Sequence, residues 1–366
     1  MKVAIVHDYI KDYGGAERVL EALHALYPDA TVFTSIYLPT YLGPHKKRFS
    51  SWKIKTSWAQ YLPFKAKLIS LLRLLSPLLF RSFDFSDFDV IITSATGAYF
   101  PNTLRKGKAK LVCYCHTPPR YLYGYATARE WKKNGFVRVL AEVANHFLRM
   151  VDYSASQNVD HYIANSKEVK ARIQKFYRRE SQVIYPPVEL PKISKSKQSK
   201  LYYLTGGRLA RAKHVDVIIK ACAKENLSLK VFGKAFAGYE KELRRLSGST
   251  IEFVGEVSDE EKYQLMQGAK AFLFASEDED FGITPVEAMA CGTPVIAFRS
   301  GGVKETILEN KTGLFFDQLK EESLIGKIKE FDKKEWKPDV CRARAEGFSK
   351  EKFERDLTKL LDSTLL

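Results

Sequence analysis

Short apolar runs alternate with amphipathic segments of helix length along the whole chain. Most of these runs are rich in β-branched or aromatic residues and lack strict polar alternation, which is the pattern of strands buried on both faces of a parallel sheet. The predicted strands are residues 2–7, 30–37, 89–95, 110–116, 161–166 and 182–187 in the first half, and 201–207, 227–233, 251–257, 270–276, 293–298 and 312–316 in the second. Helical patterns such as 16–27 and 215–225 separate them. This βαβ rhythm, seen twice, predicts an α/β protein with two doubly wound, Rossmann-like domains.

The boundary between the two predicted domains lies in residues 185–200. This stretch reads YPPVELPKISKSKQSK, so three prolines precede or flank a Lys- and Ser-rich run that indicates an exposed linker. We therefore predict domains over 1–185 and 186–366. The amphipathic segment 350–362 predicts a C-terminal helix, and packing back on the first domain is one arrangement open to it.

The positive charge is concentrated in the first half of the chain. The sequence has 366 residues and a formal net charge of +16, and residues 1–185 hold 28 Lys and Arg against 14 Asp and Glu. An excess of this size attracts nucleic acid, an anionic membrane or a phosphorylated substrate. The hydrophobic content of 45% is typical of a packed globular protein rather than a disordered one.

The cysteines and the apolar segments indicate in which cellular compartment the protein works. Five cysteines, odd in number and lying in strand-like or helix-like runs, favour a reduced, cytosolic environment. Cys113 and Cys115 stand beside His116, but no second pair of ligands accompanies them, so a zinc site is not expected. The most apolar segment, 68–80, is too short to cross a bilayer, which takes roughly 20 apolar residues. The apolar run at the start of the chain indicates a buried strand rather than a signal peptide.

Ligands of open α/β sheets bind at the carboxyl ends of the strands, so the residues after each strand are the candidates for chemistry. Gly14 and Gly15 open a helix whose backbone N–H groups suit an anion, although a plain tight turn also explains them. His116 leaves a central strand and is either a site residue or a structural histidine. Arg208 and Lys213 follow the first strand of the second half, where they suit a diphosphate unless they are simply solvated cations.

Residues 277–297, EDEDFGITPVEAMACGTPVIA, combine an acidic loop with the start of a helix. Gly282 lets the backbone approach a ligand closely, and Glu279 points into the site from the loop. Glu287 lies about two turns along the helix. Two such acceptors suit the vicinal hydroxyls of a sugar or a ribose. Stabilisation of acidic residues by the helix dipole explains the neighbouring acids, but not Glu287 inside an otherwise apolar helix.

The acidic run also resembles a metal-binding D-x-D motif at 278–280. We disfavour this interpretation because Arg208 and Lys213 already supply charge to neutralise a diphosphate. The prediction is therefore a site without metal and without a cofactor.

Seven segments together resemble glycosyltransferase family 4. They are GGAERVL, YCHTPPRYLY, YIANSKEVKARIQKFY, VIYPPV, GGRLARAKHVD, EDFGITPVEAMACGTPVIAFRSGGVKET and TGLFF, in this order along nearly the whole chain. The sequence is most similar to the branch that resembles GDP-mannose-dependent mannosyltransferases of O-antigen and exopolysaccharide assembly. The resemblance implies the GT-B fold, in which an N-terminal acceptor-binding domain and a C-terminal nucleotide-sugar donor domain face each other across a cleft.

The resemblance also implies roles for the candidate residues. The implied donor-binding residues are Gly14, Gly15, Arg208, Lys213, Phe281, Gly282, Ile283 and Glu287. The implied catalytic residues are His116, Glu279, Arg208 and Lys213. In this scheme Glu279 touches hydroxyls of the donor sugar and Glu287 the ribose, while backbone N–H groups at 281–283 complete the sugar site. Arg120 and Tyr121 are acceptor-side candidates.

Transfer in the family retains the anomeric configuration. Front-face attack is the expected route because no carboxylate here is an obvious nucleophile, and cations then stabilise the charge on the leaving diphosphate. The sequence departs from the mannosyltransferase branch after Arg120-Tyr121, where LYGYATARE stands instead of the usual Trp-Asp. This departure bears first on the identity of the acceptor and less on the donor sugar. The alternative to GDP-mannose is a UDP-sugar donor.

Two other functions have less support from the sequence. A nucleotide-sugar epimerase shares the fold and the His/Glu chemistry but releases a free sugar without an acceptor. A nucleic-acid-binding protein would stack bases on the interleaved aromatics and cations of residues 50–67. That function gives no joint role to Arg208, Lys213 and the two glutamates, so we expect no nucleic-acid partner.

Residues 46–81 point to a membrane surface. They mix cations with aromatic residues before a leucine-rich stretch, and the aromatic residues include Trp52, Trp58, Tyr61 and Phe64. Cations attract anionic lipid, and aromatics and leucines sit at the headgroup boundary, unless the leucines are core. Together with the resemblance, this predicts a cytoplasmic enzyme, peripheral at the inner face of the cell membrane, whose acceptor is a polyprenyl-diphosphate-linked glycan.

Overall fold

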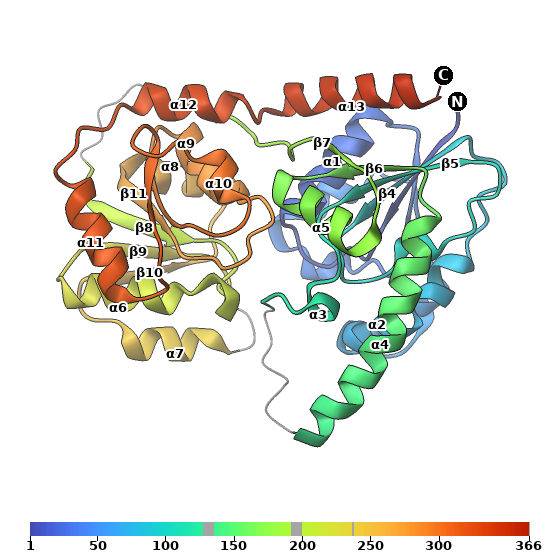
Figure 1. Ribbon diagram of the computed structural model, residues 1–366, viewed down its shortest axis with the longest axis horizontal. Helices are drawn as coiled ribbons and strands as arrows, with labels where there is room; N and C mark the ends of the chain where they lie inside the picture. The colour runs from blue at the N-terminus through green and yellow to red at the C-terminus, as the bar shows by residue number, and fades with distance from the viewer. Residues whose placement is uncertain (127–134, 192–199, 236–237, 366) are drawn as a thin grey trace. The chain divides into compact units, whose positions relative to one another are not determined.

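The computed structural model describes residues 1–126, 135–191, 200–235 and 238–365. These form two compact units (Figure 1). The first holds Met1–Tyr125, the chain on to Pro187 and the C-terminal segment from Lys350, and the second is formed mainly by Val188–Ser349. The units therefore divide inside the predicted linker, whose residues 192–199 lie outside the described part of the chain.

The first unit is built on a seven-stranded parallel sheet. Its strands are β1 (Val3–His7), β2 (Thr31–Thr34), β3 (Ile54–Thr56), β4 (Val90–Ala95), β5 (Lys110–Cys115), β6 (His161–Ala164) and β7 (Gln182–Val183). They lie in the order β3-β2-β1-β4-β5-β6-β7. Every residue of β1 and β4 is buried, as expected for central strands covered on both faces. The order reverses between β1 and β4, and open α/β sheets bind ligands at such a point.

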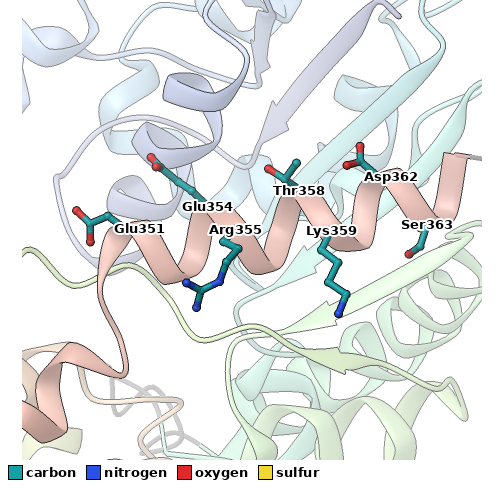
Figure 2. A pocket seen from close by; sticks show the side chains of 7 residues that line it. All are labelled: Glu351, Glu354, Arg355, Thr358, Lys359, Asp362 and Ser363. Carbon is teal, nitrogen blue, oxygen red and sulfur yellow. The ribbon is translucent and has the colours of Figure 1, made fainter.

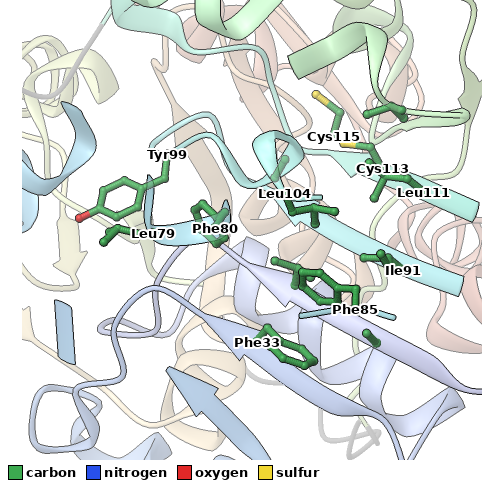
Figure 3. Close-up of a cluster of buried hydrophobic side chains, with 14 of the residues drawn as sticks. Phe33, Leu79, Phe80, Phe85, Ile91, Tyr99, Leu104, Leu111, Cys113 and Cys115 are labelled. Carbon is green, nitrogen blue, oxygen red and sulfur yellow. The ribbon is translucent and has the colours of Figure 1, made fainter. Parts of the chain in front are cut away.

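Helices cover both faces of this sheet. They are α1 (Gly15–Leu26), α2 (Lys65–Arg81), α3 (Arg120–Tyr123), α4 (Gly135–Gln157), α5 (Lys167–Tyr177) and α13 (Lys350–Leu365), with short 3₁₀ turns η1 (Pro39–Tyr41), η2 (Gly43–Phe49), η3 (Trp58–Tyr61) and η4 (Pro101–Thr103). Alternate strand residues divide between two cores. The core under α2 is shown in Figure 3, where the rings of Phe33 and Phe85 lie 4.7 Å apart.

The opposite core joins α1 to the C-terminal helix. Phe353, Leu357 and Leu361 of α13 are buried in the same apolar cluster as the inner face of α1. Their spacing of four residues places them on one face of the helix. The C-terminal helix thus packs on the sheet of the first unit, beside α1 (Figure 1).

The second unit repeats the architecture with six parallel strands. These are β8 (Tyr202–Gly206), β9 (Leu229–Phe232), β10 (Ile251–Gly255), β11 (Ala269–Phe274), β12 (Val295–Phe298) and β13 (Gly313–Phe316), in the order β10-β9-β8-β11-β12-β13. The helices are η5 (Arg211–Lys213), α6 (Val215–Lys224), α7 (Tyr239–Leu246), α8 (Asp259–Gly268), α9 (Ile283–Ala290), α10 (Val303–Thr306), α11 (Glu321–Phe331) and α12 (Pro338–Glu346). Two doubly wound parallel sheets confirm the predicted α/β class.

Segment 68–80 lies within α2 and has one buried and one exposed apolar face. Leu72, Leu79 and Phe80 point into the core, whereas other leucines of the same helix are exposed. The interpretation of the leucines as core is therefore right for one face of α2 only. Among the described residues, no helix is both long and apolar enough to span a bilayer.

Candidate active site

The acidic loop after β11 is held by a glycine-rich turn from the next strand connection. The N–H of Gly302 donates to the carbonyl oxygen of Glu279 at 2.7 Å. A Cβ at Gly301 would lie 2.1 Å from the same oxygen, so only glycine fits there. Gly282 has φ +89°, and a Cβ on it would come within 2.8 Å of Val303 Cγ1. The loop that carries Glu279 is thus fixed by backbone contacts before any ligand is present.

The loops after β8 and β11 meet because these two strands are neighbours in the sheet. The N–H of Glu277 donates to the carbonyl of Ala212 at 3.1 Å. Lys213 Nζ forms an ion pair with Glu279 Oε2, which also accepts a hydrogen bond from Ser276 Oγ at 2.6 Å. The structure therefore brings together one predicted phosphate ligand and one predicted sugar ligand.

Arg208 lies in the same connection after β8. Its side chain is exposed, and among the described residues it has no ion-pair partner. Lys213, in contrast, is half-buried and already paired with a carboxylate. The two cations predicted to hold a diphosphate thus differ in their surroundings: the charge of Lys213 is already compensated by a carboxylate, and that of Arg208 is exposed to solvent.

Glu287 is the buried carboxylate that the sequence singled out. Its exposed fraction is 2%, and Lys262 Nζ donates to its Oε1 at 2.8 Å. Lys262 lies on α8, is 7% exposed and also contacts Asp259 Oδ1 at 2.8 Å. The attraction within the pair offsets the cost of burying the two charges, whereas either charge left alone at this position would be strongly destabilising. Sequence reasoning missed Lys262, because it stands in DEEKYQ, a pattern typical of a solvated helix face.

Phe281 and Ile283 frame the helix that carries Glu287. The ring of Phe281 is buried and lies 5.4 Å from the ring of Phe348 in an edge-on contact. Ile283 is the first residue of α9. The side chain of Phe281 therefore anchors the loop in the core.

In the first unit, the Gly14-Gly15 pair forms the N-terminus of α1. Gly14 is the N-cap, and its N–H donates to Glu17 Oε2 at 2.8 Å. This N–H group was predicted to face the donor phosphates, but here it is used by a side chain of its own helix. Gly15 is the first helical residue.

His116 follows β5 and is nearly buried, with an exposed fraction of 8%. Its Nε2 lies 2.9 Å from Ser94 Oγ, and its backbone N–H donates to the carbonyl of Ala95 at 2.9 Å. Burial, together with the nearby imidazole of His7, lowers the pKa of His116 to about 3. The ring is therefore neutral at physiological pH and acts as a hydrogen-bonding group rather than a charge.

The neighbouring cysteines belong to the core. Cys113 and Cys115 are buried in the apolar cluster under α2, and Cys113 Sγ accepts a hydrogen bond from Asn102 Nδ2 at 3.3 Å. Within the described ranges, no group of His, Cys, Asp and Glu is arranged to hold a metal ion.

Arg120 and Tyr121 open the short helix α3. The guanidinium of Arg73, on α2, lies 4.3 Å from the centre of the Tyr121 ring. One turn on, Tyr123 donates a hydrogen bond to Asp152 Oδ2 at 2.7 Å. Tyr121 is thus held by a contact to α2, and α3 is tied to α4 through Tyr123.

A depression of about 750 Å³ lies elsewhere, along α13 (Figure 2). Its lining residues all come from that helix: Glu351, Glu354, Arg355, Thr358, Lys359, Asp362 and Ser363. None of the predicted site residues lines it, so it has no part in the candidate site.

Two family models match the chain in succession. The model described as Glycosyltransferase Family 4 matches residues 13–192, and the model described as Glycosyl transferases group 1 matches residues 189–348. Together they span residues 13–348, which include every candidate residue. The two models together identify the chain as a glycosyltransferase that resembles family 4 in its first half and group 1 in its second.

Relatives of this glycosyltransferase are distant in sequence. An uncharacterized glycosyltransferase of Methanocaldococcus jannaschii is 29% identical over 54% of this chain and 56% of its own length. The alpha-1,3/1,6-mannosyltransferase ALG2 of Candida glabrata is 24% identical over 68% of this chain and 62% of its own length. The ALG2 of Mus musculus is 23% identical over 82% of this chain and 80% of its own length. The first two matches thus span less than two thirds of those relatives.

Solved glycosyltransferase structures share the fold over nearly the whole chain. Anabaena HepE in complex with UDP has a TM-score of 0.73 at 18% identity, covering 99% of this chain and 100% of that one. Sucrose-phosphate synthase from Thermosynechococcus elongatus has a TM-score of 0.74 at 18% identity, covering 99% of both chains. These likenesses confirm the predicted GT-B fold.

Proposed function

We propose that this protein is a retaining hexosyltransferase that moves mannose from GDP-mannose to a lipid-linked oligosaccharide in surface polysaccharide biosynthesis. The observation that carries the proposal is the Lys213–Glu279 ion pair at the carboxyl ends of β8 and β11, with Arg208 in the same connection after β8. A cation and a hydroxyl acceptor fixed at one point suit a sugar diphosphate. The ALG2 relatives are named as mannosyltransferases, which supports mannose as the transferred sugar.

The chemistry follows from these charges. The bond between the anomeric carbon and the diphosphate oxygen breaks while the acceptor hydroxyl attacks the same face, and the hydroxyl proton passes to the departing diphosphate. Arg208 and Lys213 stabilise the negative charge that develops on that oxygen. Glu279 accepts hydrogen bonds from sugar hydroxyls, and Glu287, set by Lys262, accepts those of the ribose.

The same cations lead us to propose that the enzyme needs no divalent metal. Exhaustive chelation should leave the rate of transfer unchanged, because Arg208 and Lys213 already neutralise the diphosphate. Loss of activity on chelation, restored by Mg²⁺ or Mn²⁺, would revive a metal site at Asp278-Glu279-Asp280.

A UDP-sugar donor is the second candidate. It is favoured by solved neighbours that contain UDP or UDP-glucose. Calorimetric titration with GDP and with UDP separates the two, since the account expects GDP to bind more tightly. Clearly tighter binding of UDP would replace GDP-mannose by a UDP-sugar and leave the transfer chemistry intact.

The proposed acceptor is a polyprenyl-diphosphate-linked glycan met at the inner face of the cell membrane. Four leucines on the outer face of α2 are exposed, between Lys67 and Arg81, and these leucines are Leu71, Leu74, Leu75 and Leu78. A helix face of this kind suits the headgroup boundary of an anionic bilayer. The exposed Val139, Val143, Phe147 and Met150 form a second apolar stripe, on α4 of the same unit.

A further inference from the structure

Two buried histidines of the first unit are joined through one serine. His7 ends β1, Ser94 lies in β4, and the register of the sheet pairs these two residues directly. His7 Nδ1 lies 3.1 Å from Ser94 Oγ, and Ser94 Oγ lies 2.9 Å from His116 Nε2. Both His7 and Ser94 have an exposed fraction of 0%. The carboxyl ends of the three adjacent strands β1, β4 and β5 thus place three polar side chains in a continuous row.

The row of polar side chains continues to the N-terminus of α1. His7 Nε2 lies 3.6 Å from Glu17 Oε1, which is within electrostatic reach although longer than a hydrogen bond. The other oxygen of Glu17 accepts the N–H of Gly14 at 2.8 Å. The polar chain therefore runs from the glycine pair through Glu17, His7 and Ser94 to His116.

The chemistry of these groups gives the chain a direction. A neutral imidazole has one N–H, and a carboxylate only accepts hydrogen bonds. A neutral His7 therefore places its proton on Nε2, toward Glu17, and its Nδ1 accepts the Ser94 hydroxyl proton. The Ser94 oxygen then accepts a proton from His116 Nε2. His116 Nδ1 is left with a lone pair, and among the described residues it has no hydrogen-bond partner.

We propose that Glu17, His7 and Ser94 are positioning residues that hold His116 as its Nε2–H tautomer, so that Nδ1 accepts a hydrogen bond from a hydroxyl of the donor sugar. This inference rests on the proposed function and on the catalytic role that the family resemblance implies for His116. It goes further by naming the atom that makes the contact and the three residues that set its state.

The ordinary alternative is that buried polar groups satisfy one another with no effect on a ligand. That alternative predicts that breaking the row of hydrogen bonds lowers the stability of the protein. It does not predict that a changed tautomer of His116 slows turnover. Two readouts, one without substrate and one with it, separate the two accounts.

The first readout is nitrogen NMR of the full-length, ¹⁵N-histidine-labelled protein at neutral pH. We expect His116 to be the Nε2–H tautomer, and Ser94→Ala to convert it to a mixture. Ser94→Thr, which keeps the hydroxyl, should restore the wild-type pattern. An Nδ1–H tautomer of His116 in the wild-type protein, or no change in Ser94→Ala, overturns the proposal.

The second readout is turnover with the nucleotide-sugar donor. Ser94→Ala should lower kcat about tenfold, the equivalent of one hydrogen bond, while the affinity for free GDP stays unchanged. Ser76→Ala removes another buried serine hydroxyl of the same unit and should leave kcat unchanged. Equal kcat for Ser94→Ala and wild type overturns the proposal.

Glu17→Gln keeps the size of the side chain and provides the same test if Ser94→Ala does not fold. It removes the charge that orients His7, so the tautomer of His116 should again become mixed. The tautomer is measured without substrate, so the positioning chain can stand even if the protein transfers no sugar. If the protein is an active transferase but His116 has the other tautomer, the positioning role of Glu17, His7 and Ser94 is disproved and the proposed function is not.

Discussion

At the scale of single residues, two ion pairs of the second unit carry predictions about stability and chemistry. Lys213 and Glu279 share a half-buried ion pair, and Lys262 and Glu287 share a buried one. The first pair lies at the mouth of the β8 and β11 loops, where a ligand can compete for it. The second lies between two helices and holds a carboxylate in place.

Replacing either proposed diphosphate ligand should slow the reaction strongly. Arg208→Ala and Lys213→Ala should each lower kcat/KM by roughly 10²- to 10³-fold, the usual effect of removing a group that stabilises developing charge. Lys224→Ala removes an exposed lysine of α6 and is the matched control. Steady-state kinetics with near-normal values for either of the first two variants would remove that residue from the site.

Breaking the buried pair should destabilise the second unit. Lys262→Met leaves Glu287 buried without its cation, which should cost about 3 kcal/mol in free energy of unfolding. The double variant Lys262→Met, Glu287→Gln should recover most of that loss, because no buried charge then remains. Urea denaturation measures both. Equal stability of the single and double variants would mean that the pair is not coupled.

The sequence predicted part of this site. Glu287 was recognisable because a glutamate inside an apolar helix is unusual, and Glu279 because it follows a buried strand. Lys262, His7 and Ser94 were not recognised as parts of the site, since their contacts come from segments far away in the sequence. No local pattern distinguishes Lys262 from a solvated lysine.

At the scale of elements, a buried carboxyl ties three helices of the first unit together. Asp152 of α4 accepts hydrogen bonds from Tyr123 of α3, at 2.7 Å, and from Tyr177 of α5, at 3.1 Å. Burial raises the pKa of Asp152 to about 7 although both hydroxyls oppose the shift. The acceptor-side candidates on α3 are thus anchored through a group that titrates near neutrality.

This anchor should make stability depend on pH. An unfolded Asp titrates near 3.8 and the native one near 7, so the native state binds more protons between these values. The free energy of unfolding should therefore fall as pH rises from about 4 to 7, by roughly 4 kcal/mol at most, and level off above. Asp152→Asn should lose this slope. Urea denaturation at pH 5 and pH 8 decides it, and a pH-independent difference between the two proteins would contradict it.

Helix α2 carries the membrane prediction. Wild-type protein should sediment with anionic vesicles and not with neutral ones, and salt should release it through screening. Replacing Lys53, Lys55, Lys65 and Lys67 by glutamate should abolish sedimentation but leave GDP binding intact. The matched control carries the same four changes on exposed lysines of the second unit, namely Lys241, Lys311, Lys320 and Lys333. A wild-type protein that ignores anionic vesicles at low salt would assign the basic first half to another partner.

Most elements followed from the sequence because buried parallel strands leave a continuous apolar signal. Each of the twelve predicted runs overlaps a strand of the structure. The edge strand β3 was missed, since a lysine precedes it, its middle residue is a lysine, and none of its three residues is fully buried. A short, charged strand of this kind protects a sheet edge and has no apolar run to reveal it.

At the scale of the whole molecule, charge is divided between the two halves of the chain. Residues 1–185 hold twice as many Lys and Arg as Asp and Glu, whereas the rest of the chain is close to neutral. This division fits a first unit that meets an anionic surface and a second unit that holds its diphosphate with a few placed cations. The doubly wound order of both sheets followed from the sequence as a class, whereas the inclusion of α13 in the first unit depends on long-range packing that no local pattern contains.

The central claim is retaining transfer of mannose from a nucleotide sugar, and one assay tests it most directly. Purified protein is incubated with GDP-mannose and a polyprenyl-diphosphate-linked glycan, and the new linkage and the released GDP are followed by NMR. The account predicts one GDP released for each mannose added, and an anomeric configuration in the product equal to that of the donor. A product of inverted configuration, or no transfer from any nucleotide sugar of a broad panel, would contradict it.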